Sequence, residues 1–255
     1  MTLPLAEDRL NLILKLLVDK GSCRTSELAR QFGTSEMTIR RDLDVLASRG
    51  LIKKVHGGAT LNSVDMQFQE RQQLSRGPKE RIGLKARELI QPGQTIYIDA
   101  GTTAIQLALA LKADPQLART VYVVTHAINI AYELHSECKL YLIGGEAYQG
   151  TFSLVGPDAI QMIQKYNYDV FFVGACGIHE RSGLTNTNLI EAQLKTEIMK
   201  RSNQKVLIAD QSKWGNLGFA TFAPIDAVDL WITDHVPDDA RAVMQNRQVQ
   251  VIEAP

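Results

Sequence analysis

The sequence has few cysteines and no long apolar run. Its 255 residues include only Cys23, Cys138 and Cys176, an odd number without paired spacing. This pattern predicts neither a disulfide framework nor a zinc site, and it fits a reducing cytoplasm. No apolar run is long enough to cross a bilayer, and Glu7 and Asp8 replace the basic flank of a signal peptide. We therefore expect a cytoplasmic protein outside the membrane, with no metal or other cofactor.

An excess of charge of either sign is also missing. Lys plus Arg and Asp plus Glu each number 28, so the formal net charge is zero. Residues 1–60 contain ten basic and seven acidic side chains, a surplus of three positive charges that the rest of the chain balances. The hydrophobic share of 45% and the charged share of 22% are typical of a folded, soluble protein. The N-terminal surplus gives weak support for contact with nucleic acid there.

Two helices joined by a turn at Gly33 are predicted near the N-terminus. In the second helix Ile39, Leu43 and Leu46 recur at spacings of four and three, so they share one face, which must be buried. Ser35 precedes this helix and suits its N-cap. The pattern is that of a helix-turn-helix, in which the start of the second helix is presented outward.

The outward face of that helix carries Met37, Thr38 and Arg41, with Arg40 on its flank. Helix-turn-helix proteins place the start of the second helix in the major groove of DNA, where arginine contacts guanine and short polar side chains read other base edges. Thr38 and Arg41 are therefore the best candidates for reading bases.

A basic hairpin is predicted after the second helix. The run 51–56 ends at Gly57-Gly58, a dipeptide that permits the positive φ angles of a tight turn. Lysines on such a wing meet phosphates, which strengthens binding without specifying sequence. The complete set of predicted DNA-binding residues is Ser35, Met37, Thr38, Arg40, Arg41, Lys53, Lys54 and His56. The alternative is three short helices with solvated arginines that never touch nucleic acid, and the wing argues against it.

A change of composition marks the domain boundary. Residues 62–78 are polar and rich in glutamine and serine, which predicts a linker, partly helical. We therefore expect a first domain over residues 1–61 and a second over 79–255.

The second domain alternates apolar runs with helical segments. Such alternation predicts an α/β fold with a mostly parallel sheet covered by helices. The runs are 95–98, 121–124, 140–143, 170–173, 206–209 and 230–233. Ligands of such sheets bind beyond the carboxyl ends of the strands, so the polar residues that follow each run are the candidates for a site.

The first of these strand ends resembles an anion cradle. Asp99, Gly101, Thr102 and Thr103 follow the run 95–98 and precede an apolar helix. Glycine lets backbone N–H groups approach an anion, and the helix dipole favours negative charge. The loop lacks the lysine and spacing of a Walker motif, so a nucleoside triphosphate is not indicated. An ordinary helix start is the alternative.

Polar residues follow the other strands too. Lys195 and Lys213 are the cations best placed to complement a phosphate, while Asp99, Glu191 and Asp210 can accept hydrogen bonds from sugar hydroxyls. Alternatively, Glu191 and Lys195 lie four residues apart and pair with each other. The complete set of predicted ligand-binding residues is Asp99, Gly101, Thr102, Thr103, Thr125, His126, Gly145, Glu191, Lys195, Asp210 and Lys213.

Six ordered blocks of the sequence together resemble the DeoR family of bacterial transcription regulators over nearly the whole chain. They are SEMTIRRDLDVLASRGLI with HGGA, then IDAGTT, VVTHA, LIGGE, GLTNTNLIEAQLK and ADQSKWG. The resemblance implies a winged helix-turn-helix that binds a double-stranded operator, usually as a repressor. It also implies a C-terminal α/β sensor domain, similar to sugar-phosphate isomerases, that binds a phosphorylated sugar, and a homo-oligomer, either dimer or tetramer.

Carried over by position, the resemblance makes the loop from Asp99 to Thr103 the phosphate site and Lys213 an effector contact. Two residues depart from the family pattern. His126 stands where the family commonly has Asn, which changes the donors and acceptors offered to hydroxyls. Cys176 stands where the family commonly has Asp, so one acid used by the related isomerases is missing.

Two other functions are consistent with the sequence. An isomerase-like enzyme with an appended DNA-binding domain would use Glu191 as general base and Lys195 as its electrostatic partner. A DNA-binding protein whose second domain serves only for oligomerisation would bind no effector. We expect neither, and we predict no catalytic residues.

Overall fold

The chain consists of two compact units, residues 1–74 and 75–255. The computed structural model describes residues 6–20, 22–48, 52–55, 57–61, 68–148 and 151–254. The two units meet in sequence within 62–78, the segment for which the sequence predicts a linker. The described part of that segment is largely helical, since α4 and the start of α5 fall in it.

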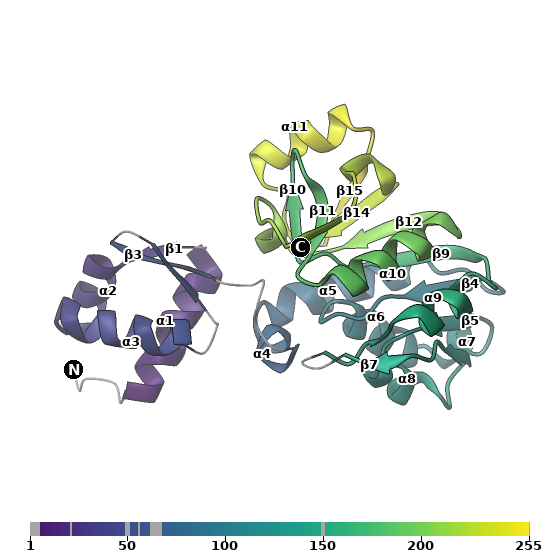
Figure 1. Cartoon of the computed structure of the whole chain (residues 1–255), viewed down its shortest axis with the longest axis horizontal. Coiled ribbons are helices and arrows are strands. Elements are labelled where there is room, and N and C mark those ends of the chain that lie inside the picture. Colours follow the sequence, from purple (N-terminus) through teal and green to yellow (C-terminus); the bar gives the residue numbers. More distant parts are fainter. Residues whose placement is uncertain are drawn as a thin grey trace. The chain divides into compact units, whose positions relative to one another are not determined.

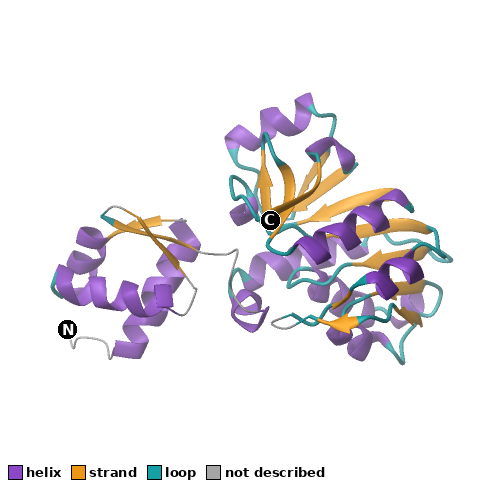
Figure 2. Cartoon of the chain, in the orientation of Figure 1, coloured by secondary structure: helices purple, strands orange, loops and turns teal. Residues whose placement is uncertain are grey.

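The N-terminal unit combines helices with a small antiparallel sheet (Figures 1 and 2). The sheet has the strand order β1-β3-β2, and strands β2 and β3 form the predicted wing hairpin. Its elements are α1 (Ala6–Lys20), β1 (Ser22–Arg24), α2 (Thr25–Phe32), α3 (Glu36–Ser48), β2 (Ile52–Val55), β3 (Gly58–Leu61) and α4 (Phe68–Gln73). The winged helix-turn-helix predicted from the sequence is confirmed.

The core of this unit is built on the predicted face of α3. Ile39, Leu43 and Leu46 are at most 1% exposed and belong to one cluster with Ile13 and Leu17 of α1. The spacing of apolar residues therefore identified the buried face correctly.

The wing turn depends on two adjacent glycines with different roles. Gly57 has φ +77°, which side chains rarely adopt, and it makes the turn. A Cβ on Gly58 would lie 2.2 Å from the carbonyl oxygen of Cys23, so only glycine lets β3 approach β1 here. The hairpin is thus fixed both at its turn and against the neighbouring strand.

The C-terminal unit contains a parallel sheet with the order β15-β14-β12-β9-β4-β5-β6. Its strands are β4 (Thr95–Ile98), β5 (Tyr122–Thr125), β6 (Lys139–Leu142), β9 (Tyr168–Val173), β12 (Ser202–Ile208), β14 (Leu230–Thr233) and β15 (Gln250–Glu253). The six predicted runs all form strands of this sheet. The edge strand β15 was not predicted, because its polar ends are exposed and it lacks an apolar run.

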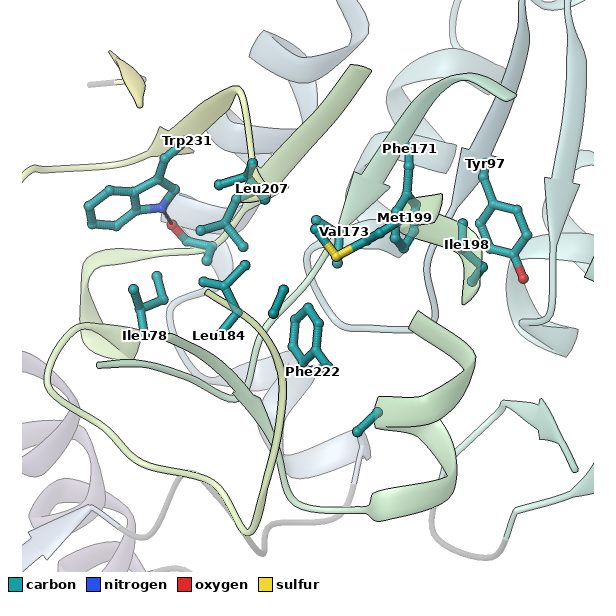
Figure 3. Close-up of a cluster of buried hydrophobic side chains, with 14 of the residues drawn as sticks. Tyr97, Phe171, Val173, Ile178, Leu184, Ile198, Met199, Leu207, Phe222 and Trp231 are labelled. Atoms are coloured by element: carbon teal, nitrogen blue, oxygen red, sulfur yellow. Dashed lines mark hydrogen bonds between the residues drawn. The ribbon is translucent and has the colours of Figure 1, made fainter. Parts of the chain in front are cut away.

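Helices pack on this sheet, and two smaller antiparallel elements adjoin it. Residues of α9, α10 and α11 share one apolar cluster with Tyr97, Phe171 and Trp231 of the sheet (Figure 3), while α5, α6 and α8 pack side by side. The helices are α5 (Arg76–Arg87), α6 (Ala104–Lys112), α7 (Pro115–Ala118), α8 (Ile128–Leu134), α9 (Pro157–Ile163), α10 (Leu189–Lys200) and α11 (Asp238–Asn246). The smaller sheets are β10 (Gly177–His179), β11 (Gly183–Asn186) and β13 (Ala220–Ala223), and the hairpin β7 (Glu146–Ala147) with β8 (Leu154–Val155).

Candidate functional site

The predicted recognition helix begins with a side-chain cap. The Oγ of Ser35 accepts a hydrogen bond of 3.1 Å from the backbone N–H of Thr38, as an N-cap residue does. The hydroxyls of the two residues are also 2.9 Å apart. The cap holds the first turn of α3, which carries Thr38, and Arg41 lies in the next turn.

The outward face of α3 is open to solvent. Met37 is 60% exposed, and Arg40 and Arg41 are exposed beside it. Arg40 lies 3.7 Å from Glu36 across one helical turn, a weak ion pair, whereas no ion pair of Arg41 is found among the described residues. The guanidinium of Arg41 is therefore available to a base edge.

The wing is tied to the recognition helix by charge. Lys54 of β2 forms an ion pair with Asp44 of α3, and both side chains are about half exposed. For Lys54 to bind a phosphate, as the sequence predicts, it must exchange this carboxylate for the DNA backbone. Lys53 lies in β2 with its side chain outside the described part, and His56 lies outside the described residues.

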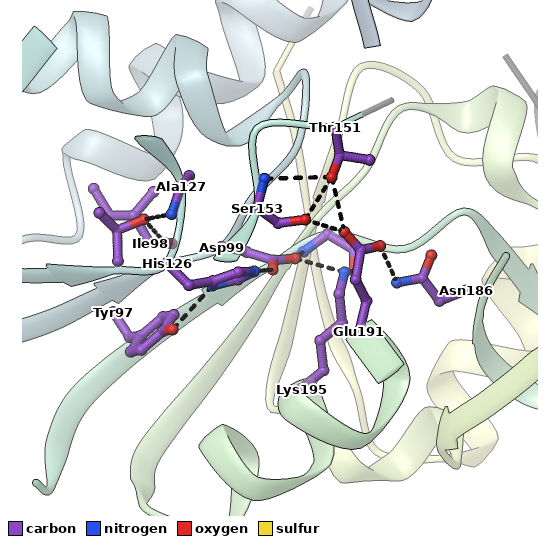
Figure 4. Close-up of polar contacts among 12 residues, drawn as sticks. Tyr97, Ile98, Asp99, His126, Ala127, Thr151, Ser153, Asn186, Glu191 and Lys195 are labelled. Atoms are coloured by element: carbon purple, nitrogen blue, oxygen red, sulfur yellow. Dashed lines mark hydrogen bonds and ion pairs between the residues drawn. The ribbon is translucent and has the colours of Figure 1, made fainter. Parts of the chain in front are cut away.

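In the C-terminal unit, Asp99 is the centre of a buried polar cluster at the carboxyl end of β4 (Figure 4). Its Oδ2 accepts hydrogen bonds from Lys195 Nζ at 2.7 Å and from the Gly174 N–H at 2.8 Å. Lys195 also donates to the Gly174 carbonyl oxygen at 2.7 Å. Three segments far apart in the sequence thus meet at one carboxylate.

Lys195 is held here as a buried cation. Its side chain is 5% exposed, and burial by itself lowers the pKa of an ammonium group. The charges of Asp99, Cys176 and Glu191 and the hydrogen bond to Asp99 outweigh burial, so the net pKa of Lys195 is raised. The charge of Lys195 is therefore already balanced within the protein.

Glu191 has different partners, although it lies on the same helix. Its carboxylate accepts hydrogen bonds from Ser153 Oγ and from Asn186 Nδ2, the latter at 3.1 Å. Because Lys195 pairs with Asp99 instead, the alternative that Glu191 and Lys195 pair with each other is not found. Asn188 caps α10 by accepting hydrogen bonds from the N–H groups of residues 190 and 191. The cap fixes the start of the helix that carries Glu191 and Lys195.

His126 lies on the other side of Asp99. Its Nδ1 is 2.9 Å from the Tyr97 hydroxyl, and its Nε2 is 3.8 Å from Oδ1 of Asp99. Burial lowers the pKa of His126 despite the opposing charges of Asp99 and Glu191, and the Lys195 charge lowers it further. The imidazole is therefore neutral at pH 7.

The loop after Asp99 leads into α6. Gly101 and Thr102 are partly exposed, whereas Thr103 is buried. A Cβ added to Gly101 would meet nothing within 4 Å, so the backbone is approachable there. The N–H groups of Ile105 and Gln106 already donate to the carbonyl oxygens of Gly101 and Thr103, at 3.1 and 3.0 Å. An anion at this helix start would therefore be bound by the N–H groups that precede them. The geometry suits an anion.

Asp210 and Lys213 form a second polar group, after β12. Since β9 lies between β12 and β4, this group is about 10 Å along the sheet edge from Asp99. Asp210 is buried, which raises the pKa of a carboxyl, but the charges of Lys213 and Lys79 and the hydrogen bonds from Ser212 lower the net pKa of Asp210. Lys213 remains partly exposed.

Two of the predicted ligand-binding residues have evident structural roles. The Thr125 hydroxyl donates to the Ile98 carbonyl at 2.8 Å and accepts from the Ala127 N–H at 3.1 Å. Gly145 has φ +150°, and a Cβ there would lie 2.5 Å from the carbonyl oxygen of Val155. Both residues shape the sheet edge, and their contact with a ligand stays a prediction.

Several residues of the cluster were missed by sequence reasoning. Tyr97 sits inside an apolar run and looks like core, and Ser153 lies in the hairpin β7–β8, where nothing in the sequence points to Glu191. Asn186 bonds both Glu191 and the thiol of Cys176, whose Sγ lies 3.0 Å from the Asn186 Oδ1. Only the strand order brings these residues together.

No group of three or more His, Cys, Asp or Glu side chains suited to a metal ion occurs in the described part of the chain. Within the same residues, no helix is both long and apolar enough to cross a membrane.

A winged helix-turn-helix unit joined to an α/β unit with polar groups at one sheet edge defines a two-domain DNA-binding transcription regulator. Residues 9–65 match the model of the DeoR-like helix-turn-helix domain, and residues 75–235 match that of the DeoR C-terminal sensor domain. The chain belongs to the DeoR family.

Named relatives of the chain are transcription regulators. The HTH-type transcriptional regulator GlpR of Haloferax volcanii is 34% identical, with 98% of each chain covered. The glycerol-3-phosphate regulon repressor of Escherichia coli is 33% identical, with 90% of this chain and 91% of the relative covered. Among solved structures, ribose 5-phosphate isomerase A of Methanocaldococcus jannaschii is similar at 19% identity and a TM-score of 0.38, with 53% of each chain covered.

Proposed function

We propose that the protein is a repressor that leaves its operator when a phosphorylated sugar or polyol binds the C-terminal unit. The observation that carries this proposal is the joint presence of an approachable helix start at Gly101 and the buried cluster around Asp99. The first suits a phosphate, and the second offers acceptors and donors for hydroxyl groups. The name of the Escherichia coli relative, a glycerol-3-phosphate regulon repressor, supports the same class of effector.

The effector is proposed to contact the predicted residues in two groups. The loop from Gly101 to Thr103 and Lys213 receive the phosphate, while Asp99, Glu191 and His126 face the hydroxyl-bearing carbons. Lys195 acts through Asp99, because its ammonium group already donates to the Asp99 carboxylate and to the Gly174 carbonyl oxygen. The regulator works in the cytoplasm as a homo-oligomer, so that two recognition helices can read two half-sites.

Release from DNA requires that the effector prefer the arrangement that cannot bind the operator. Only a difference in affinity between two arrangements shifts their populations. A change from almost fully bound to almost fully free needs about 5.5 kcal/mol of such preference in total. One phosphate and several hydroxyl contacts contribute part of this preference in each subunit, and an oligomer multiplies the contribution.

We propose that the site binds without catalysing a reaction. A general base needs a carboxylate free to take a proton from the substrate, and the carboxylate of Glu191 is already hydrogen-bonded to Ser153 and Asn186. Prolonged incubation of the pure protein with ribose 5-phosphate or fructose 6-phosphate should therefore leave both compounds unchanged. Turnover that disappears in Glu191→Gln would instead establish the isomerase-like alternative.

The proposal is tested by measuring DNA and effector binding together. DNA fragments selected from the host genome by the purified protein supply the operator. Glycerol 3-phosphate, ribose 5-phosphate and fructose 6-phosphate are then titrated into the complex, with inorganic phosphate as a control for the anion alone. Release by at least one of them, accompanied by thermal stabilisation of about 2.7 kcal/mol at a hundredfold excess over Kd, is the expected result.

A matched pair of variants separates specific from general effects of charge. Lys213→Gln should weaken the response to the effector, whereas Lys205→Gln, in the middle of β12 and five residues before Asp210, should not. If no phosphorylated compound stabilises the protein or releases DNA, the C-terminal unit is a structural oligomerisation domain and the proposal is wrong.

A further inference from the structure

Tyr97 has an unusual position for a core residue of a strand. Its ring packs edge-on against Tyr168 and Phe171, with ring centroids 5.0 and 5.4 Å away, so the ring is fixed inside the apolar cluster. Its hydroxyl nevertheless lies 2.9 Å from Nδ1 of His126. Figure 3 shows the ring within the core, and Figure 4 shows the hydroxyl directed at the imidazole. One side chain thus joins the core to the polar cluster.

The surroundings determine which nitrogen of His126 carries the proton. A neutral imidazole has one N–H group, and burial of both groups keeps the Tyr97 hydroxyl protonated and His126 neutral. If Nδ1 carried the proton, the Tyr97 proton would face aromatic rings without an acceptor, and an Nε2 lone pair would face the Asp99 carboxylate. If Tyr97 donates to Nδ1, the proton lies on Nε2 and faces Asp99 favourably. The second arrangement gives the Tyr97 proton an acceptor and directs the Nε2–H group toward the Asp99 carboxylate.

The Nε2 atom and the nearer oxygen of Asp99 are both buried and both lack a hydrogen-bond partner in the described chain. Their separation of 3.8 Å is too long for a direct hydrogen bond. One oxygen atom placed beside them can contact both at about 2.8 Å. A donor and an acceptor at this spacing match a hydroxyl group, which accepts from one and donates to the other.

Oδ1 of Asp99 cannot turn away from this position. The other oxygen of the carboxylate is held by Lys195 and by the Gly174 N–H, so the orientation of the carboxylate is fixed. The acceptor is therefore positioned by Lys195 as the donor is positioned by Tyr97.

We propose that Tyr97 is a positioning residue that fixes His126 as an Nε2–H donor, and that this donor and Oδ1 of Asp99 together receive one hydroxyl group of the effector. The inference rests on the proposed function, since it assumes that the effector binds at this cluster. It narrows the effector to a phosphate ester with an unsubstituted hydroxyl at the position that reaches His126. A keto or ether oxygen only accepts, and it would leave Asp99 unpaired. Both protein atoms are closed to solvent, so the hydroxyl enters only when neighbouring side chains move aside.

The state of His126 is tested first, without any ligand. The full chain is labelled with ¹⁵N-histidine, and the ring nitrogens of residue 126 are assigned by their loss in His126→Asn. The expected spectrum shows a neutral ring protonated at Nε2, and Tyr97→Phe shifts it toward a mixture of tautomers. Tyr168→Phe is the control, because it removes another hydroxyl of the same aromatic cluster. Among the described residues, that hydroxyl donates to the Ile163 carbonyl and not to His126. A wild-type ring protonated at Nδ1, or an unchanged tautomer in Tyr97→Phe, overturns the inference.

The proposed hydroxyl site, formed by Nε2–H of His126 and Oδ1 of Asp99, is tested by ligand binding. The ligand is whichever of glycerol 3-phosphate, ribose 5-phosphate and fructose 6-phosphate binds the wild-type protein, and it is compared with its deoxy analogues. Removal of one particular hydroxyl is expected to weaken binding about tenfold. Tyr97→Phe should weaken binding of the parent compound to a similar extent while leaving the Kd of that deoxy analogue unchanged. If the Nε2–H group instead bonds directly to Asp99, Tyr97→Phe weakens binding of the parent compound and of the deoxy analogue equally. That result disproves the proposed hydroxyl site.

The two experiments separate the inference from the function on which it rests. Failure of all three esters to bind the wild-type protein overturns the proposed function and the proposed hydroxyl site together, whatever the tautomer of His126. Binding of an ester by a protein whose His126 is protonated at Nδ1 overturns the inference alone.

Discussion

The ammonium group of Lys195 lies 2.7 Å from the carboxylate of Asp99, although the two residues are 96 positions apart in the sequence. The pair joins the second turn of α10 to the end of β4 inside the protein, and Gly174, which directly follows β9, bonds both partners. Removing one member leaves the other as an uncompensated buried charge, which is far more costly than removing both.

Asp99→Asn should therefore destabilise the C-terminal unit by about 3 kcal/mol. Trp214 and Trp231 are the only tryptophans and both lie in that unit, so denaturant unfolding followed by their fluorescence reports on it alone. The double variant Asp99→Asn with Lys195→Met should recover part of the loss. A double variant less stable than the single one would show that the unpaired charge of Lys195 is not the cause of the loss.

Arg9 and Asp42 form the corresponding pair in the N-terminal unit. Arg9 Nε and Nη2 donate to the two carboxylate oxygens at 2.6 and 3.0 Å, and both side chains are about nine-tenths buried. Arg9→Met should lower the free energy of unfolding of this unit by about 2 kcal/mol, measured by amide hydrogen exchange in α1 and α3. Arg40→Met removes an exposed pair with Glu36 and should cost less than about 0.5 kcal/mol. Equal effects of the two variants would contradict this difference in burial.

The contact between Lys54 and Asp44 predicts an unusual gain of function. Asp44→Asn removes an acidic group near the DNA and frees Lys54 for a phosphate, so affinity should rise severalfold on operator and unrelated DNA alike. Lys54→Ala should weaken both and reduce the salt dependence of binding. Binding is measured by fluorescence anisotropy at several salt concentrations. An affinity unchanged in Asp44→Asn would mean that Lys54 does not reach the DNA.

Arg41→Ala should behave differently from both wing variants. Because Arg41 is expected to contact a base edge, its loss should weaken operator binding by about 1–3 kcal/mol and relax the preference for the operator. Its effect on unrelated DNA should be small. The same anisotropy assay decides, and an equal loss on every sequence would place Arg41 on the phosphates instead.

The parts of the fold that depend on local patterns were predictable from the sequence. The buried face of α3 follows from the spacing of Ile39, Leu43 and Leu46, and the wing turn follows from Gly57-Gly58. Six of the seven strands of the parallel sheet follow from their apolar runs. Strand β15 escaped prediction because an edge strand needs no continuous apolar run, and only its pairing with β14 defines it.

The polar cluster was predictable in composition but not in its pairings. Asp99 and His126 follow neighbouring parallel strands and therefore lie at one sheet edge, as the rule for such sheets predicts. Lys195 reaches the same place from helix α10. The partner of Lys195 depends on strand order and helix placement, and local spacing pointed to Glu191 instead. Tyr97 gave no signal at all, because a tyrosine within an apolar run is ordinarily a core residue.

The lowered pKa of His126 predicts how stability depends on pH. Burial resists protonation of the folded ring, with Lys195 adding to the effect and Asp99 and Glu191 opposing it. Below about pH 6.5 the unfolded chain takes up a proton that the folded chain does not, so stability falls as the pH falls, until the lower pKa of the folded state is reached. The loss of stability attributable to this residue is at most about 1.4 kcal/mol for each pH unit.

His126→Asn should remove this pH dependence. The free energy of unfolding, followed by tryptophan fluorescence between pH 7.5 and 5.5, should therefore change less in the variant than in the wild type. Asp210, whose pKa is also lowered, loses its stabilising contribution only near pH 4 and below. Equal pH dependence in the wild type and the variant would mean that His126 is protonated as readily in the folded protein as in the unfolded chain.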